Sequence, residues 1–172
     1  MGWDWRLSVA SIVEDGVFST FPGVDRIAVL VDGTVELESS IGSLSWCTEG
    51  DMHAFAGEAM FTARLFGGPA RFFNVMTRRE HAVAEVVVHR KGFSLETSVA
   101  EQVSLLVLNG RFRVIGTEGE HWLDAEQGLL SSTLQQGAEV SLSGMSGCLV
   151  EVRLNRTIVS PDRGIPPALL HR

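Results

Sequence analysis

The 172-residue sequence contains no tyrosine, two cysteines and a single lysine, Lys91. Two isolated cysteines, Cys47 and Cys148, are too few for a disulfide-stabilised secreted domain, so we expect both thiols to be inert. The absence of tyrosine removes a common proton donor from any acid–base site. No apolar run approaches the roughly 20 residues of a membrane span, and no signal peptide is recognisable. We therefore expect a cytoplasmic protein without a membrane partner.

The charged and metal-binding residue types also exclude two kinds of partner. The net charge is −7, and the 14 basic residues are scattered along the chain. A nucleic-acid partner is therefore not expected, because binding to a phosphate backbone needs clustered positive charge. The five histidines form no H-x-H pair, the strand spacing that places two metal ligands on one face. We interpret them as surface or capping residues and predict neither a metal nor a cofactor.

What the sequence does contain is a series of short apolar blocks with period two, separated by Gly, Asp and Asn about every ten residues. This pattern is typical of an all-β sandwich or barrel. No segment shows helical periodicity over three turns. The predicted strands are 5–12, 27–31, 34–38, 59–66, 71–78, 84–89, 104–108, 111–115, 138–142 and 148–154.

The sequence also repeats itself. Residues 27–37, IAVLVDGTVEL, align with residues 104–114, SLLVLNGRFRV, and residues 57–79 share a strand–turn–strand plan with residues 137–156. The Asp-Gly and Asn-Gly pairs in the first match predict hairpin turns. Two matches in the same order predict a duplicated unit. We expect two cupin-like jelly-roll β-barrels in one chain, a bicupin, with halves at 1–80 and 81–160 and a tail at 161–172.

Polar residues share faces of strands that are otherwise apolar. Alternation places Arg6 with Ser8, Asn74 with Met76 and Arg78, and Arg64 with Met60, while Asp25 and Arg26 stand at the start of an apolar strand. If these faces line a barrel, guanidinium and amide donors among Met and Phe walls suit a small carboxylate. The alternative is that the arginines lie on solvent-exposed strand faces and that Asp25 and Arg26 form a local turn pair.

Three motifs resemble the HutD/Ves family of bacterial bicupins. They are the start DWRLSVASI, the corner FSTFPGVDR and the strand FFNVMTRR, and a weaker match follows in VLNGRFRV. The resemblance implies a non-enzymatic protein, in one branch linked to histidine utilisation with N-formyl-L-glutamate as ligand, and in the other to stress response. It implies these ligand-binding residues: Arg6, Ser8, Asp25, Arg26, Phe55, Asn74, Met76 and Arg78. Family members usually begin with a further segment containing W-x-N-x-x-G-x-T-R-E, so we expect one pocket wall to be truncated or absent here.

Three functions follow from these observations. The first is a regulatory protein that binds a small carboxylate, with Asp25 orienting Arg26 by a hydrogen bond. The second is a metal-free isomerase or lyase that uses Asp25 or Glu58 as base, which requires a carboxylate of raised pKa in the cavity. The third is an interaction protein that forms a homodimer through an exposed edge strand and has no pocket.

Overall fold

The fold was analysed in a computed structural model that describes residues 2–95, 102–117, 119–131 and 137–157. Every regular element in these ranges is a β-strand, so the all-β prediction is confirmed. No helix of the described chain is long and apolar enough to cross a membrane. The predicted tail, 161–172, lies outside the described residues.

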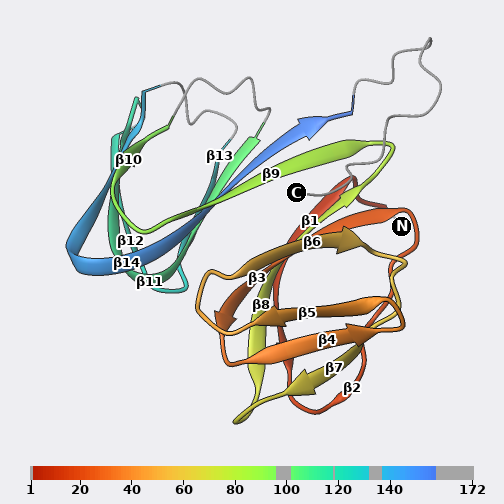
Figure 1. The fold of residues 1–172 in the computed structure, drawn as a ribbon. Helices are drawn as coiled ribbons and strands as arrows, with labels where there is room; N and C mark the ends of the chain where they lie inside the picture. The colour runs from red at the N-terminus through yellow and green to blue at the C-terminus, as the bar shows by residue number, and fades with distance from the viewer. Residues whose placement is uncertain (1, 96–101, 118, 132–136, 158–172) are drawn as a thin grey trace.

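The first eight strands form two four-stranded antiparallel sheets (Figure 1). One sheet has the order β1-β8-β3-β6, and the other has the order β2-β7-β4-β5. We call this part, residues 5–78, the first repeat. Its strands are β1 (Trp5–Ile12), β2 (Gly16–Val17), β3 (Val24–Asp32), β4 (Val35–Ser39), β5 (Gly42–Trp46), β6 (Met52–Ala56), β7 (Thr62–Leu65) and β8 (Ala70–Arg78).

The remaining six strands form one sheet and make up the second repeat, residues 82–156. Its centre is the pair of long strands β11 and β14, against which β9, β10, β12 and β13 pair. The strands are β9 (Ala82–His89), β10 (Phe93–Ser94), β11 (Gln102–Gly116), β12 (Gly119–Asp124), β13 (Gly128–Ser131) and β14 (Glu139–Arg156).

The same order of strand pairing occurs in both repeats. β9 pairs with β14 as β1 pairs with β8, and β13 pairs with β11 as β6 pairs with β3. The β11–β12 pair likewise matches the β4–β5 pair. The pairings of the described strands form open sheets and no closed barrel. The two-barrel architecture therefore stays a prediction.

The predicted hairpins at Asp32–Gly33 and Asn109–Gly110 are wrong. β3 and β4 belong to different sheets, and β11 runs through Gly110 as one strand with register shifts. Gly33 and Gly110 have φ angles of 87° and 85°. A Cβ atom on Gly33 would lie 2.5 Å from the carbonyl oxygen of Pro69. Both glycines therefore lie where two backbone segments approach closely. At Gly33 the chain passes from one sheet to the other, and at Gly110 strand β11 changes its partner from β13 to β12.

Three apolar clusters hold the structure together. One lies between the two sheets of the first repeat and includes Trp46 and Phe72, and a second fills the second repeat around Phe112. The third lies between the repeats, where Phe73 and Val75 of β8 pack with Val150 and Val152 of β14 and their neighbours. The strands β3 and β8 therefore bury both faces, which leaves their inner face fixed against the opposite sheet.

Candidate functional site

The inner face of the β1-β8-β3-β6 sheet brings together most of the predicted site residues. The strand registers place Arg6 opposite Met76, Met76 opposite Arg26, and Arg26 opposite Phe55. These four residues form a row across the sheet. Because side chains alternate along each strand, all four point to the same side.

The next row toward the middle of the strands contains Ser8, Asn74 and Ala28. A pocket of about 410 Å³ lies over this face, between β1 and the segment from Val13 to Phe21. Five of the predicted residues line it. They are Arg6, Ser8, Arg26, Asn74 and Met76.

Arg26 is the buried cation of this pocket, with 3% of its surface exposed. Its Nη1 donates to the carbonyl oxygen of Ser19 at 2.8 Å, and its Nη2 donates to Oδ1 of Asn74 at 3.0 Å. The guanidinium carbon also lies 4.6 Å from the ring centre of Phe18 and 5.1 Å from that of Phe21. Burial lowers the pKa of Arg26 to about 10, which leaves the group charged at neutral pH.

The Nε atom of Arg26 is buried and has no hydrogen-bond partner. A buried donor without an acceptor costs about 1–3 kcal/mol, so such groups are rare and commonly have a functional explanation. Phe55, which is not among the pocket-lining residues, holds the same guanidinium from the side at 5.2 Å. The fold thus fixes a guanidinium that has donor capacity left over.

The predicted pairing of Asp25 with Arg26 is wrong. Neighbouring residues of an extended strand point to opposite faces, so Asp25 lies outside the pocket. Its carboxylate instead accepts from Nε of Arg79 at 2.8 Å. Glu58 binds the same guanidinium at 2.9 Å and 3.0 Å. These two carboxylates form a surface cluster with Arg79 and do not orient Arg26.

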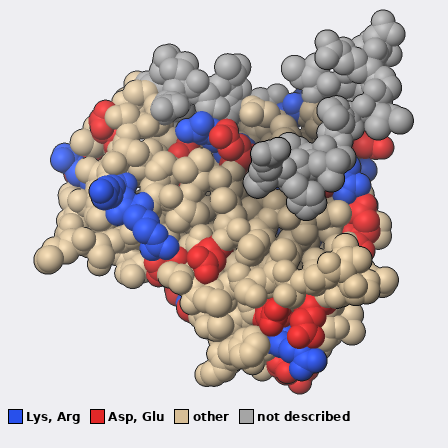
Figure 2. Space-filling view, viewed as in Figure 1, with Lys and Arg blue, Asp and Glu red and all other residues tan. Residues whose placement is uncertain are grey.

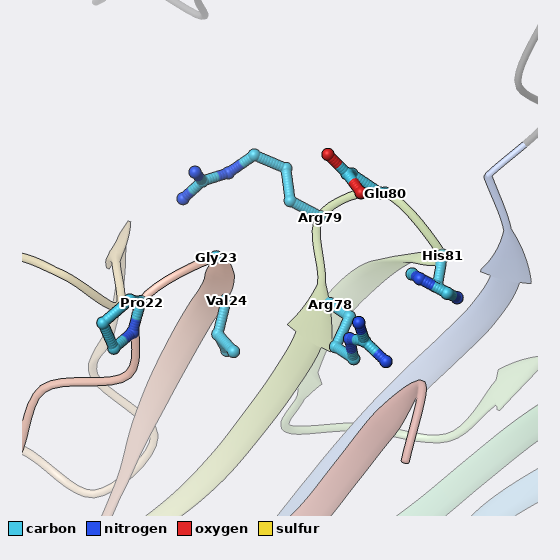
Figure 3. Close-up of a pocket in the computed structure, with 7 residues that line it drawn as sticks. All are labelled: Pro22, Gly23, Val24, Arg78, Arg79, Glu80 and His81. Atoms are coloured by element: carbon cyan, nitrogen blue, oxygen red, sulfur yellow. The ribbon is translucent and has the colours of Figure 1, made fainter. Parts of the chain in front are cut away.

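Arg78 lines a different pocket, of about 330 Å³, together with Pro22, Gly23 and His81. Figure 3 shows its side chain directed toward β1, whereas Arg79 points away on the other side of the strand end. Because β8 is continuous from Ala70 to Arg78, side-chain alternation places Arg78 on the same face of the strand as Asn74 and Met76, as predicted. This pocket shares no lining residue with the pocket that contains Arg26.

The structure does not place the two proposed bases in the Arg26 pocket. The hydrogen bond from Arg79 lowers the pKa of Glu58 to about 2, the opposite of the raised pKa that a catalytic base requires. Arg64 also lies outside and forms an exposed ion pair with Glu38 at 2.7 Å. The charged residues of the first repeat thus divide into a buried site around Arg26 and surface ion pairs.

Sequence reasoning predicted Phe55 but missed the other two aromatic residues that contact Arg26, Phe18 and Phe21. Phe18, Ser19 and Phe21 belong to the segment before β3, which has no strand periodicity. The available signal was the spacing of the two phenylalanines around a Ser-Thr pair immediately before the Pro-Gly corner. The described residues include no group of three or more side chains suited to a metal ion. Burial raises the pKa of the Cys148 thiol to about 11, which keeps it protonated.

The surface of the molecule carries mixed charge. On the face shown in Figure 2, acidic and basic side chains lie close to one another in small groups, and much of the surface is uncharged. Ion pairs of the described residues include Arg113–Glu120 and Arg71–Asp32. The Arg26 pocket is itself lined by two arginines, Arg6 and Arg26, and by two acidic residues, Glu14 and Asp15.

Comparisons with known proteins identify a family. The model of the HutD family matches residues 1–150. Protein Ves of Citrobacter koseri is 34% identical over 126 residues, which cover 72% of this chain and 63% of that protein. The chain therefore spans less than two thirds of the length of this curated relative.

Solved structures agree with the observed fold. HutD from Pseudomonas fluorescens is 26% identical with a TM-score of 0.72, covering 88% of this chain and 80% of that one. A conserved protein of unknown function from Pseudomonas aeruginosa has a TM-score of 0.77 at 21% identity, with coverages of 90% and 83%. A cupin 2 conserved barrel domain protein from Leptotrichia buccalis reaches 0.61 at 10% identity, with coverages of 88% and 84%. The last two similarities concern the fold alone.

Proposed function

The chain belongs to the HutD family, and from that premise we propose that it binds a small carboxylate metabolite at Arg26 without converting it. The observation that carries this proposal is that Arg26, a buried guanidinium with an unpartnered Nε, lines a pocket of about 410 Å³. Pockets of about 300–1,000 Å³ suit small metabolites. A carboxylate that accepts from this guanidinium would satisfy the donor that the protein leaves unpaired.

A second positive group defines the ligand further. Arg6, which is solvent-exposed, lines the same pocket, and Met76 separates it from Arg26 in the row of paired residues. Two interstrand spacings put the two Cα atoms about 10 Å apart, a span that long arginine side chains reduce. The proposed ligand is therefore a dicarboxylate that places one carboxylate at each guanidinium and keeps both away from Glu14 and Asp15, which also line the pocket. N-formyl-L-glutamate, the ligand that the family resemblance implies, has two carboxylates and a formyl oxygen that the Asn74 amide could recognise.

The proposal treats each repeat as one cupin-like unit and assigns ligand binding to the first. It includes a cytoplasmic regulatory role in histidine utilisation, in keeping with the family. The absence of turnover is supported by the position of Asp25 and Glu58, the two proposed bases, at the surface with Arg79. Binding without conversion requires only donors and walls of the kind that surround Arg26.

Calorimetric titration with N-formyl-L-glutamate, L-glutamate and urocanate tests the proposal. We expect N-formyl-L-glutamate to bind at one site. Arg26→Lys should weaken binding at least about 30-fold, because lysine lacks the planar, forked donors. Arg64→Gln is the matched control, since this arginine is exposed outside the pocket. Absence of heat with all three compounds, or equal affinity in Arg26→Lys, would overturn the assignment.

A further inference from the structure

The pocket that contains Arg26 extends along β1 well beyond that residue. Its lining follows the strand from Arg6 to Ile12 and continues to Glu14 and Asp15 in the segment after it. A strand rises about 3.3 Å per residue, so the Cα atoms of Arg6 and Glu14 lie up to about 26 Å apart. A molecule the size of N-formyl-L-glutamate, bound at the two arginines, fills one end of this groove. The rest of the groove has no assigned occupant.

The two ends of the groove carry opposite charges. Arg6 and Arg26 lie at one end, in the same row across the sheet. Glu14 and Asp15 lie at the other end. The carboxylate of Asp15 is held in place, because its Oδ1 accepts from the backbone N–H of Leu65 at 2.8 Å. Among the described residues the carboxylate of Glu14 has no hydrogen-bond or ion-pair partner, so it has acceptor capacity for a ligand.

Strand β1 is an edge of its sheet and leaves backbone groups unpaired. It pairs with β8 alone. The backbone N–H of Arg78 donates to the carbonyl oxygen of Asp4 at 2.8 Å, so every second residue from Asp4 onward bonds toward β8. The N–H and C=O groups of Leu7, Val9 and Ser11 therefore point to the free edge, where no described residue bonds to them. Ser11 also lines the pocket, so the groove reaches this edge.

We propose that the groove takes an extended N-acyl-L-glutamate, namely a short peptide whose last residue is glutamate. This inference rests on the proposed binding of two carboxylates at Arg26 and Arg6, and it extends the ligand from that end. The peptide backbone runs antiparallel to β1 along its free edge, and the terminal ammonium group reaches Glu14 and Asp15. N-formyl-L-glutamate is the shortest member of this class, with the same two carboxylates and the same first N–H.

The chemistry of the groove favours a peptide over other long dicarboxylates. A free strand edge offers alternating donors and acceptors, which an extended peptide backbone matches. The opposite charges at the two ends complement the two termini of a peptide. The buried, unpartnered Nε of Arg26 supplies a donor at the carboxylate end. Between the ends the lining includes the small side chains of Ser8 and Ala10, so small residues suit the middle of the ligand.

A length series tests the extension of the ligand. Gly-Glu, Gly-Gly-Glu, Gly-Gly-Gly-Glu and Gly-Gly-Gly-Gly-Glu are titrated into the full chain by calorimetry, with N-formyl-L-glutamate as reference. We expect affinity to rise with length and one of the two longest peptides to bind at least about tenfold more tightly than the reference, because each added backbone hydrogen bond contributes about 0.5–1.5 kcal/mol. Peptides that all bind no more tightly than N-formyl-L-glutamate would overturn the inference.

The acidic end has its own test. Glu14→Gln should weaken the tightest peptide about three- to fivefold and leave the affinity for N-formyl-L-glutamate unchanged, since a partly exposed charge pair is worth at most about 1 kcal/mol. The N-acetylated form of the same peptide lacks the ammonium group and should be insensitive to Glu14→Gln. Glu36→Gln, a matched change outside the pocket lining, is the control. Equal weakening of the free and the acetylated peptide would contradict the role of Glu14.

Pairing with the edge of β1 is tested in the peptide itself. N-methylglycine replaces glycine at one of two adjacent positions of the tightest peptide, which removes one backbone N–H each time. In a strand, one of two adjacent N–H groups faces the neighbouring strand and the other faces away. We therefore expect one replacement to weaken binding at least about tenfold and the other to have little effect. Equal effects of the two replacements would exclude strand addition.

The outcomes separate this inference from the proposed function. Tight binding of N-formyl-L-glutamate without any gain from the longer peptides would leave the proposed function standing and refute the extended ligand. Silence from every compound would refute both. Arg26→Lys should weaken N-formyl-L-glutamate and the peptides alike, because both place a carboxylate at this guanidinium. Peptide binding that is unchanged in Arg26→Lys would show that the peptides bind elsewhere.

Discussion

The two repeats pair their strands in the same order but fill corresponding interior positions with opposite chemistry. At one position of the central strand the first repeat has the neutral Asn74, and the second has the ionised Glu151. The first repeat buries a cation that has a spare donor, whereas the second buries an anion whose two oxygens are both bonded. The two repeats therefore share the order of backbone pairing and the glycine positions, while their inner side chains differ in charge.

The largest expected effect comes from removing the buried anion of the second repeat. Glu151→Ala leaves Arg153 and His89 without their central acceptor in the interior, and breaking a buried pair in this way costs about 3–5 kcal/mol. Urea unfolding of the full chain measures the loss. Asn74→Ala, the matched change in the first repeat, should cost about 1–2 kcal/mol because only one bond to Arg26 is lost. Equal losses of unfolding free energy in the two variants would mean that Glu151 does not form a stronger buried network than Asn74.

Making the first interior resemble the second should abolish its binding function. Asn74→Asp keeps the shape and the acceptor for Arg26 but adds a negative charge beside the proposed anion. Two like charges about 5 Å apart at an effective dielectric constant of about 20 repel by about 3 kcal/mol, or roughly a hundredfold in affinity. Calorimetry with N-formyl-L-glutamate gives the change in Kd. Unchanged affinity would show that the anion does not bind near this position.

The corresponding glycines allow a smaller test of the shared backbone. Gly33→Ala and Gly110→Ala each combine a positive φ with a backbone oxygen 2.5 Å and 2.8 Å from the added Cβ, so we expect losses of about 2–3 kcal/mol. Gly67→Ala has a similar φ of 84° but open space, and should cost only about 1 kcal/mol. Thermal unfolding distinguishes these values. A difference between Gly33 and Gly110 would show that the two positions are not equivalent.

The smallest effect should come from the exposed carboxylate of the first repeat. The pKa of Glu58 is lowered to about 2 by Arg79, so its ion pair stabilises the fold above the unfolded pKa of about 4.5 and is lost as pH falls toward 2. Because both side chains are substantially exposed, Glu58→Gln should cost less than about 1 kcal/mol at pH 7 and nothing near pH 2. Urea titrations at the two pH values measure this. A larger loss at pH 2 would reverse the sign and refute the pairing.

The sequence predicted which side chains share one face of a strand, because this follows from the alternation of side chains along a strand. Alternation alone placed Arg6 with Ser8 and Asn74 with Met76, and the register of β1 against β8 brings these pairs together. Alternation should also have separated Asp25 from Arg26, because adjacent strand residues cannot share a face. The predicted turns failed because Asn-Gly and Asp-Gly pairs supply positive φ to any tight approach and not to hairpins alone.

Other features depend on contacts that no local pattern encodes. The strands β2, β5, β6, β10, β12 and β13 were not predicted, and none of them has more than six residues. Phe18 and Phe21 reach Arg26 from a loop, and the buried Glu151 lies 2.7 Å from His89, which is remote in sequence. A glutamate inside the apolar run CLVEVRL was nevertheless a visible sign of a buried charge.

The central claim is that the buried guanidinium of the first repeat receives a carboxylate ligand. A crystal structure of the full chain grown with N-formyl-L-glutamate tests it most directly. The account predicts one carboxylate of the ligand within hydrogen-bonding distance of the Arg26 guanidinium, in the pocket between β1 and residues 13–21. Ligand density elsewhere on the molecule, with the Arg26 pocket empty at saturating ligand, would contradict it.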